Sequence, residues 1–248
     1  MPSINDRALI AGDPRAGETD LLAASIDRSP KVRAAAAENP STPPEVLAQL
    51  VEDDRWQVRF AVVDNPTAEA LRIALSSSDP DVRGLAAQRD DLNRAQVQQV
   101  LQDPAHSVRE QLSLVATDDE VMRRLARDPH PAVRASLASN SALPLDVLVT
   151  LARDGRAAVR SAAAASRRLP PEVLTELATD RSVQVQWNVL VSNPERLDIA
   201  TTIAGHSDAM NVDQAQAQLE HPENFTRFLG PIDLVQSNDN ELRSEATE

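Results

Sequence analysis

Short apolar groups recur along this chain at helical spacing, and polar segments separate them. In residues 46–51 the apolar side chains fall at positions i, i+1, i+4 and i+5, which places them on one side of a helix. Equivalent quartets start every 24 to 26 residues, at 21, 46, 70, 96, 121, 147, 173, 199 and 224. The pattern predicts a series of short helices that bury the same face.

A second pattern, Val-Arg preceded by an aspartate, has the same period. Six copies follow one another at spacings of 24 to 26 residues, and in a seventh the arginine is replaced by Gln186. The arginines are Arg33, Arg59, Arg83, Arg109, Arg134 and Arg160. Taken together, the two patterns predict about nine repeats over residues 1–230, with degenerate first and last copies, as expected of capping repeats.

Each repeat is predicted to contain two short helices. Steps such as Asp79-Pro80 and Asp128-Pro129 predict the start of the first helix, with an N-cap followed by proline at the first helical position. Asn39-Pro40 predicts its end, since the residue before proline disfavours the α conformation. Thr42, with Glu45 three residues later, predicts a capping box for the second helix.

The composition favours an all-α fold. Aromatic residues make up 2% of the chain, there is no tyrosine, and there are only six glycines. A core of alanine, valine and leucine suits closely packed helices better than a sheet. The chain has no cysteine, which excludes disulfides, thiolate metal sites, iron–sulfur ligation and cysteine nucleophiles.

The segment from Asp27 onward closely resembles the bacterial variant leucine-rich repeat. The resemblance lies in its Val-Arg-Ala-Ala-Ala-Ala, Asn-Pro and Thr-Pro-Pro-Glu steps. The resemblance extends, more loosely in some repeats, over about nine-tenths of the chain. It implies a HEAT-like, right-handed α-solenoid of two-helix repeats, in which the second helix can be partly 3₁₀. One known member of this family carries a cysteine-ligated iron–sulfur cluster, but without cysteine no such cofactor is expected here. Residues 231–248 break the period and are expected to form a disordered acidic tail.

The formal net charge of −13 disfavours nucleic acid as a partner. No apolar run approaches the length of a membrane-spanning helix, and the first residues lack a secretory signal pattern, so we expect a cytoplasmic protein without membrane insertion.

The arginine ladder has two interpretations. Such a row could contact phosphates or an acidic partner. Alternatively, each arginine pairs with an aspartate of its own or the next repeat, or with carbonyls at the end of a neighbouring helix. We favour the second interpretation, because a residue present in successive copies is explained more simply by the fold of the repeat than by one site.

Residues that depart from the repeat are better candidates for a binding site. Phe60 and Trp187 occupy the position of Ala34, which is predicted to face away from the buried side of the first helix, and Trp56 lies one turn before Phe60. Exposed aromatic residues are plausible binding anchors. They could instead fill gaps between repeats or cover an end of the solenoid.

The outward positions of the second helices form another candidate surface. This surface is locally basic at Arg123, Arg124 and Arg127. In solenoids the concave surface usually binds partners, although a solvated face would have the same composition.

Catalytic patterns are not evident. The four histidines lack metal-ligand spacing, and we find neither a glycine-rich phosphate loop nor a nucleophile elbow. We therefore predict a non-enzymatic scaffold that binds a protein or peptide partner, with no cofactor. The alternative is a HEAT-like nucleic-acid-binding or base-repair protein, which would need a basic concave face with an aromatic and an acidic side chain converging on it. A HEAT-repeat lyase would need a large apolar cavity.

Overall fold

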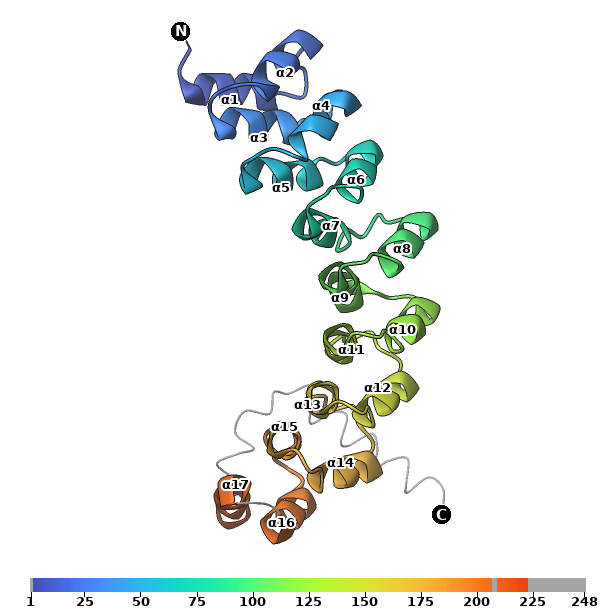
Figure 1. The fold of residues 1–248 in the computed structure, drawn as a ribbon. Coiled ribbons are helices and arrows are strands. Elements are labelled where there is room, and N and C mark those ends of the chain that lie inside the picture. Colours follow the sequence, from blue (N-terminus) through green and yellow to red (C-terminus); the bar gives the residue numbers. More distant parts are fainter. Residues whose placement is uncertain (1, 207–208, 223–248) are drawn as a thin grey trace, which may run out of the picture. The chain divides into compact units, whose positions relative to one another are not determined.

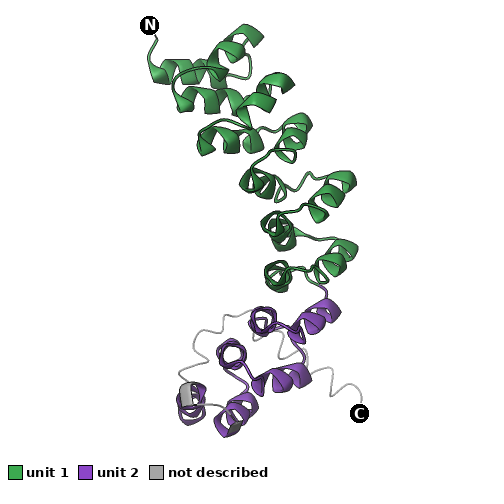
Figure 2. Cartoon of the chain, viewed as in Figure 1, with its two compact units in different colours: residues 1–143 green, residues 144–248 purple. Residues whose placement is uncertain are grey.

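The computed structural model describes residues 2–206 and 209–222, and these residues contain helices and no strand (Figure 1). They divide into two compact units, Met1–Leu143 and Pro144–Glu248 (Figure 2). Successive helices pair as predicted, with an odd-numbered first helix and an even-numbered second helix in each repeat. The all-α repeat architecture expected from the sequence is thus confirmed.

In unit 1 the first helices form one layer and the second helices form the other. The first helices are α1 (Ile4–Gly12), α3 (Pro30–Glu38), α5 (Trp56–Asp64), α7 (Pro80–Ala86), α9 (His106–Val115) and α11 (Pro131–Ala138). The second helices are α2 (Glu18–Ser25), α4 (Pro44–Leu50), α6 (Ala68–Ala74), α8 (Arg94–Leu101) and α10 (Asp119–Leu125). Each first helix packs on the next, from α1 to α11.

Unit 2 repeats the same arrangement. Its first helices are α13 (Ala157–Ala164), α15 (Val183–Ser192) and α17 (Ala209–Glu220), and its second helices are α12 (Leu145–Ala152), α14 (Pro171–Ala178) and α16 (Leu197–His206). α13 packs on α15 and α15 on α17, while α12 packs on α14 and α14 on α16. The second half of the ninth repeat and the tail expected at 231–248 lie outside the described residues.

The Val-Arg valines and the second-helix quartets form the core. Val32, Val58 and Val82 have at most 1% of their surface exposed, and the equivalent valines of the later repeats are also buried. Helices of seven to ten residues are marginal alone, so this stacking must stabilise them. The second helices are regular α-helices within the described residues, and the 3₁₀ character that the resemblance allowed is not seen there.

Two capping predictions are wrong. α4 begins at Pro44 with Pro43 at its N-cap, and the hydroxyl of buried Thr42 donates instead to the carbonyl of Ala36, at the end of the preceding helix. At Asp128-Pro129 the helix begins later, at Pro131, with His130 as N-cap. In both places the side chain has a partner outside the helix that it was expected to cap. The Thr42 hydroxyl binds the carbonyl of Ala36, and the Asp128 carboxylate binds Arg109 of the preceding repeat.

None of the described helices is long and apolar enough to cross a membrane.

Candidate functional site

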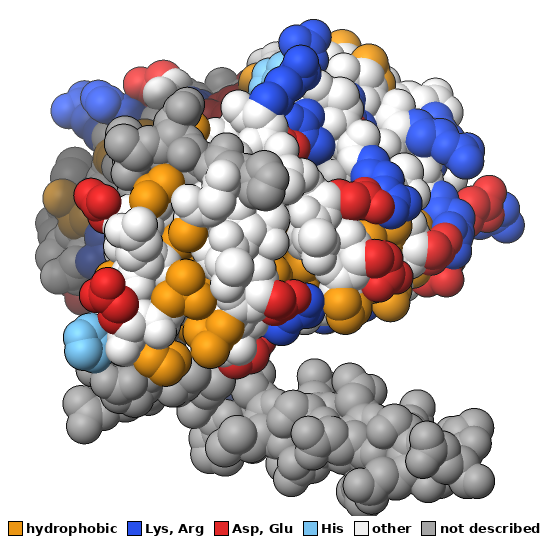
Figure 3. Space-filling view, turned by 90° about the horizontal axis from the view of Figure 1, so that it is seen from below, with side chains coloured by type: hydrophobic (Ala, Val, Ile, Leu, Met, Phe, Trp, Pro, Cys, Tyr) orange, Lys and Arg blue, Asp and Glu red, His pale blue; other side chains and the backbone are white. Residues whose placement is uncertain are grey.

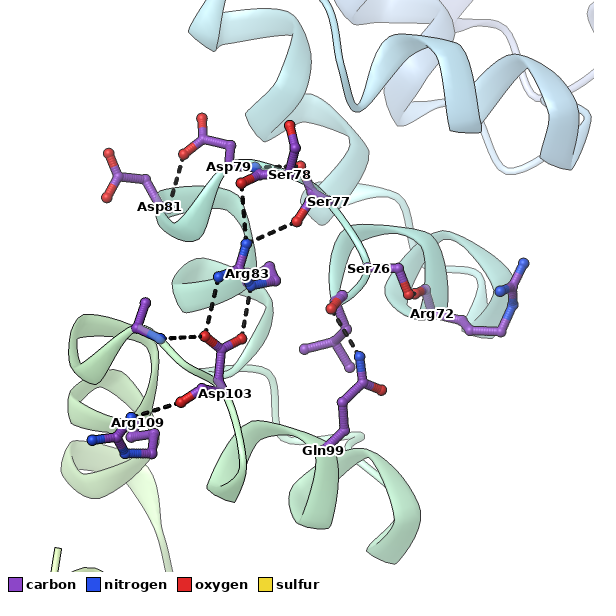
Figure 4. Close-up of polar contacts among 12 residues, drawn as sticks. Arg72, Ser76, Ser77, Ser78, Asp79, Asp81, Arg83, Gln99, Asp103 and Arg109 are labelled. Atoms are coloured by element: carbon purple, nitrogen blue, oxygen red, sulfur yellow. Dashed lines mark hydrogen bonds and ion pairs between the residues drawn. The ribbon is translucent and has the colours of Figure 1, made fainter. Parts of the chain in front are cut away.

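The ladder arginines bind aspartates of the following repeat, as Figure 4 shows for Arg83 and Asp103. Arg83 Nε lies 2.7 Å from Asp103 Oδ2, and Nη2 donates to Oδ1 of the same carboxylate. Arg83 Nη1 donates to the carbonyls of Ser77 and Ser78, which precede its own helix. The same ion pair joins further repeats at 2.6–2.8 Å: Arg7–Asp27, Arg33–Asp53, Arg59–Asp79 and Arg109–Asp128 in unit 1, and Arg160–Asp180 in unit 2.

The carboxylates of Asp27 and Asp128 each have a pKa below the ordinary value of an aspartate. Burial by itself would raise the pKa of Asp128, but the bonds from Arg109 and from the amide of His130 outweigh it, so the pKa lies below its ordinary value. The pKa of Asp27 is lowered mainly by its bond with Arg7. Because these guanidinium groups are occupied within the fold, the structural interpretation of the ladder is confirmed.

The sequence analysis missed the first rung of the ladder. Arg7 lies 26 residues before Arg33, so the period alone could have revealed it. The signal was hidden because Asp6 stands where the other repeats have valine.

A second ladder, made of asparagines, also escaped the sequence analysis. Asn65 is fully buried, and its amide donates to the carbonyls of Ala37 and Asn39 in the preceding repeat. Asn39 and Asn140 make equivalent bonds, and Arg89 takes over the role by donating to the carbonyls of Val63 and Asn65. These residues satisfy backbone carbonyls at the ends of first helices, which would otherwise be left open.

The second helices are less uniform than the first. α2 packs on α4 and α4 on α6, but α8 lies apart from α10. A groove of about 1330 Å³ lies between α8 and α10 and includes parts of the loops that follow them. All the residues that line the groove belong to unit 1.

Apolar and basic side chains line this groove. Leu92, Val97 and Val121 supply partly exposed apolar surface, whereas Leu101 and Leu125, which also line the groove, are buried. Arg123, Arg124 and Arg127, which the sequence analysis singled out, are exposed and line the same groove, as do Arg94, Asp118 and Glu120. The structure therefore places the predicted basic residues on a hollow surface with an apolar floor.

The sequence of α8 explains why the groove is open. Gln96 stands where α4 has buried Val46, and its side chain caps its own helix by accepting from the amide of Asn93. Polar bridges replace apolar packing on both sides of α8. Gln99 donates to the carbonyl of Leu75, and Arg124 donates to Gln98 across the groove at 2.7 Å.

Trp56 and Phe60 lie on α5, in the layer of first helices, so they do not share a surface with the arginines of α10. Their rings meet edge to face with centroids 5.4 Å apart, and Trp56 is 55% exposed whereas Phe60 is half-buried. Trp187 is half-buried on α15 in unit 2.

The position that Phe60 and Trp187 share does not generally face solvent, contrary to the sequence-based expectation. Gly84 at this position is buried, and a Cβ there would lie 3.2 Å from Gln111 of the next repeat. Ser161 is also buried and accepts a bond from Asn188. At these two repeats the position thus lies near the junction with an adjacent repeat.

Two histidines from successive first helices or the loops before them lie against each other. His106 and His130 stack in parallel with ring centroids 3.5 Å apart, and Glu110 lies 4.0 Å from His106. Within the described part of the chain, no three His, Asp or Glu side chains are placed to hold a metal ion.

On the face of the molecule seen in Figure 3, hydrophobic side chains gather on one side, and arginines lie beside acidic residues on the other. In unit 2, Arg153 lies 2.8 Å from Glu176 and forms an exposed ion pair with it. A nucleic-acid backbone is attracted by a continuous basic surface, and mixed charges of this kind do not form one.

Taken together, the paired helices, the repeated ladders and the stacked layers define a helical repeat protein. Residues 30–55 match the leucine-rich repeat variant family model. The fold is similar to the solved structure of a leucine-rich repeat variant described as having a novel repetitive structural motif, with 25% identity, 84% of each chain covered and a TM-score of 0.58. The resemblance predicted from the sequence is thus found again in residues 30–55, and the fold of the chain is similar to that of a solved leucine-rich repeat variant. No curated protein shows significant sequence similarity to the chain.

Proposed function

We propose that this chain is a non-enzymatic repeat scaffold that binds a protein or peptide partner, and that the groove between α8 and α10 is its docking site. One observation carries the proposal: the layer of second helices opens at this point and presents apolar side chains that the other repeats bury. The bacterial and cytoplasmic setting expected from the sequence stays a prediction.

The exposure of Val97 illustrates this difference. It occupies the position of Leu47 and Leu71, each only 1% exposed, yet Val97 is half-buried and lines the groove. Partly exposed apolar side chains beside arginines are typical of the centres of protein interfaces. A partner that covers the floor of the groove would bury these apolar side chains and leave both ladders unchanged.

The proposal is tested by capturing partners on the immobilised full chain and on the Val97→Glu variant. Glutamate at this half-buried position is compatible with the fold but places a charge on the groove floor. A double variant, Arg15→Glu/Arg28→Glu, changes exposed arginines outside the groove and serves as control. Partners retained by the wild type and the control but lost by Val97→Glu support the groove, whereas equal retention by all three proteins contradicts it.

Nucleic-acid binding is the second candidate, because Arg123, Arg124 and Arg127 are exposed together on one helix end. The mixed charges around them and the net charge of −13 disfavour it. Labelled single- and double-stranded DNA distinguish the two proposals. We expect no binding at about 0.15 M salt, where long-range attraction is largely screened, and saturable binding that Arg123→Glu abolishes would favour nucleic acid.

A further inference from the structure

Among the described residues, α1 is covered on one side only. It packs on α3 and on its own second helix α2, whereas α3 packs between α1 and α5 (Figure 1). The side of α1 that faces away from α3 is therefore an end of the stacked helices in unit 1. Terminal repeats of a solenoid usually have a polar outer face at such an end. Two large apolar side chains, Leu9 and Ile10, depart from that rule because both are exposed.

Leu9 lies on the side where a preceding repeat would pack. Ala35, 26 residues later, contacts the repeat before it, because a Cβ at Gly12 would lie 3.9 Å from the Cβ of Ala35. At the same position of later repeats, three side chains bind the preceding repeat: Gln111 binds Gln88, Ser136 binds Glu110, and Asn188 binds Ser161. Leu9 has no such neighbour among the described residues and is 77% exposed.

Ile10 is likewise exposed at a position that interior repeats bury. Ala36, Val62 and Val189 occupy the same position and have none of their surface exposed, whereas Ile10 is 49% exposed. We call Leu9 and Ile10 the α1 end face. It presents one half of an interface that the stacking of later repeats completes. Large apolar side chains exposed side by side mark an interaction surface more often than isolated ones do.

Asp13 changes the polar chemistry at the end of α1. Its equivalent in the next repeat, Asn39, donates its amide hydrogens to the carbonyls of Ala11 and Asp13 in the repeat before it. A carboxylate has no hydrogen to donate, so Asp13 can only accept, and one of its oxygens accepts from the amide of Arg15. This end of α1 therefore favours a partner that brings hydrogen-bond donors or positive charge.

Two further aspartates of the first repeat stand where the next repeat buries valine. Asp6 is exposed at the position of Val32, and Asp20 is exposed at the position of Val46. Each of the two valines is only 1% exposed. The first repeat thus has carboxylates at positions that are covered in the interior of the stack.

The cations nearby do not neutralise these carboxylates. Arg7 is bound by Asp27 of the next repeat through two bonds, and Lys31 donates to an amide oxygen on α1. Arg15 is exposed, but exposed Glu18 follows it in the same part of the chain. The surroundings of the α1 end face are therefore acidic.

These features favour one kind of partner. A second copy of the chain, docked through the same face, would bring like carboxylates together, and like charges at close range repel each other. A helix fits the geometry, since α1 packs on the helix α3 on its other side. Positively charged side chains on such a helix would complement Asp13 and Asp20.

We infer that the α1 end face binds an amphipathic helix of a partner protein, whose apolar side chains cover Leu9 and Ile10 and whose Lys or Arg side chains lie beside Asp13 and Asp20. The helix takes the place that a preceding first helix occupies in the later repeats. This surface is separate from the groove between α8 and α10, so the inference does not rest on the proposed docking site.

The inference is tested by displaying random peptides of about 18 residues on phage, long enough to form a helix, and selecting them against the full chain. Enriched peptides are synthesised, and their affinity is measured by fluorescence anisotropy at about 0.15 M salt. We expect peptides with Leu or Ile at helical spacing together with Lys or Arg. Circular dichroism should show that they gain helix on binding.

The apolar contact is tested with Leu9→Gln/Ile10→Gln, for which we expect the affinity to fall more than about tenfold. Leu22→Gln/Ile26→Gln is the matched control, since its two residues are 45% and 79% exposed, close to the values of the end face. The equivalent residues of the next repeat stay exposed, so the control positions do not belong to the interface between repeats. The control should bind like the wild type.

The charges are tested separately with Asp13→Asn/Asp20→Asn. We expect the affinity for a basic peptide to fall about two- to fivefold, since exposed ion pairs contribute little. The affinity should also depend less on salt than in the wild type. An unchanged affinity with an unchanged salt dependence would overturn the assignment of a basic partner.

Other results would overturn the inference as a whole. Equal affinity for the wild type and Leu9→Gln/Ile10→Gln, or no enrichment over the bare support, would contradict it. Loss of binding in Val97→Glu but not in Leu9→Gln/Ile10→Gln would place the peptides in the groove, so the proposed docking site would stand while this inference fails. A dimer in analytical ultracentrifugation that Leu9→Gln/Ile10→Gln abolishes would show that a second copy covers the face instead.

Discussion

Two regions of unit 1 differ although they are built from the same repeat. At α4 and α6 the second helices pack on each other and bury Leu47 and Leu71, whereas at α8 and α10 they separate and leave Val97 half-buried. The first helices pack on one another through both regions, and the arginine ladder runs along them without a break from Arg7 to Arg109.

The difference indicates that the two layers have separate roles, the first helices in stability and the second helices in forming the variable surface. The ladders join successive repeats through the first helices, so the second helices can diverge without loss of the stack. Gln96 then takes the place of a buried valine, and Gln98 and Gln99 form polar bridges to the neighbouring repeats where the groove lies. We therefore expect stability to depend on the first-helix layer and on α4 and α6, and partner binding to depend on α8 and α10.

The largest expected contrast is between Leu47→Ala and Val97→Ala. Leu47 is 1% exposed, so its truncation should reduce the free energy of unfolding by about 3 kcal/mol. Val97 is half-buried beside the groove, and its truncation should cost less than about 1 kcal/mol. Urea denaturation followed by circular dichroism measures both, and equal losses would contradict the open packing of α8.

A ladder rung in the open region should be nearly as important as a core leucine. Asp128→Ala leaves the guanidinium of Arg109 without its carboxylate, and we expect a loss of about 3 kcal/mol in the free energy of unfolding. The apolar pair Arg109→Met/Asp128→Leu should recover much of this loss, because no charge is then buried alone. Arg124→Ala, on the exposed rim, should change the stability by less than about 0.5 kcal/mol. A similar loss in Arg124→Ala would show that the two layers do not have separate tasks.

The asparagine ladder should contribute a smaller amount. Asn65→Ala removes the amide that satisfies the carbonyls of Ala37 and Asn39, and we expect a loss of about 2 kcal/mol. Asn5→Ala is the matched control, because the side chain of Asn5 is exposed and accepts a bond from Lys31. Thermal and chemical unfolding of both variants give the comparison, and an unchanged Asn65→Ala protein would refute a stabilising role for this ladder.

The pH dependence of stability should reflect the ladder carboxylates. The pKa values of Asp27, Asp128 and Asp180 are lowered in the folded protein, so their ion pairs add stability above the ordinary aspartate pKa of about 3.9. That stability should be lost progressively as the pH falls below about 5 and through the lowered values. Unfolding curves at several pH values should show that the free energy of unfolding falls less steeply with pH in Arg109→Met/Asp128→Leu than in the wild type. Parallel pH dependences would contradict a contribution of the ladder carboxylates to stability.

The repeat units were predictable because the fold repeats the same few requirements. A buried valine, an arginine that reaches the next repeat and an apolar quartet appear in the sequence at a fixed period. Arg7 was missed because Asp6 replaces the usual valine, and the asparagines were explained by the prolines that follow them, which hid their bonds to the preceding repeat. Thr42 was assigned a local cap, although its hydroxyl satisfies a carbonyl of the previous helix.

The candidate site was predictable only in part. Arg123, Arg124 and Arg127 stood out as a basic departure from the repeat, and they do line the groove. The groove itself depends on the distance between α8 and α10, which is set by packing over several repeats and leaves only a weak signal, Gln96, in the sequence. The assignment of Trp56, Phe60 and Trp187 as binding anchors stays a prediction.

Hydrogen exchange of the full chain, with and without a partner captured on the immobilised chain, tests the central claim most directly. Without the partner, the amides of α8 should exchange faster than those of α4, because α8 has fewer packed neighbours. With the partner, new protection should appear in residues 94–101 and 119–127, while α4 and α6 remain unchanged. Protection confined to the first helices, or to α4 and α6, would contradict the assignment of the groove as the binding surface.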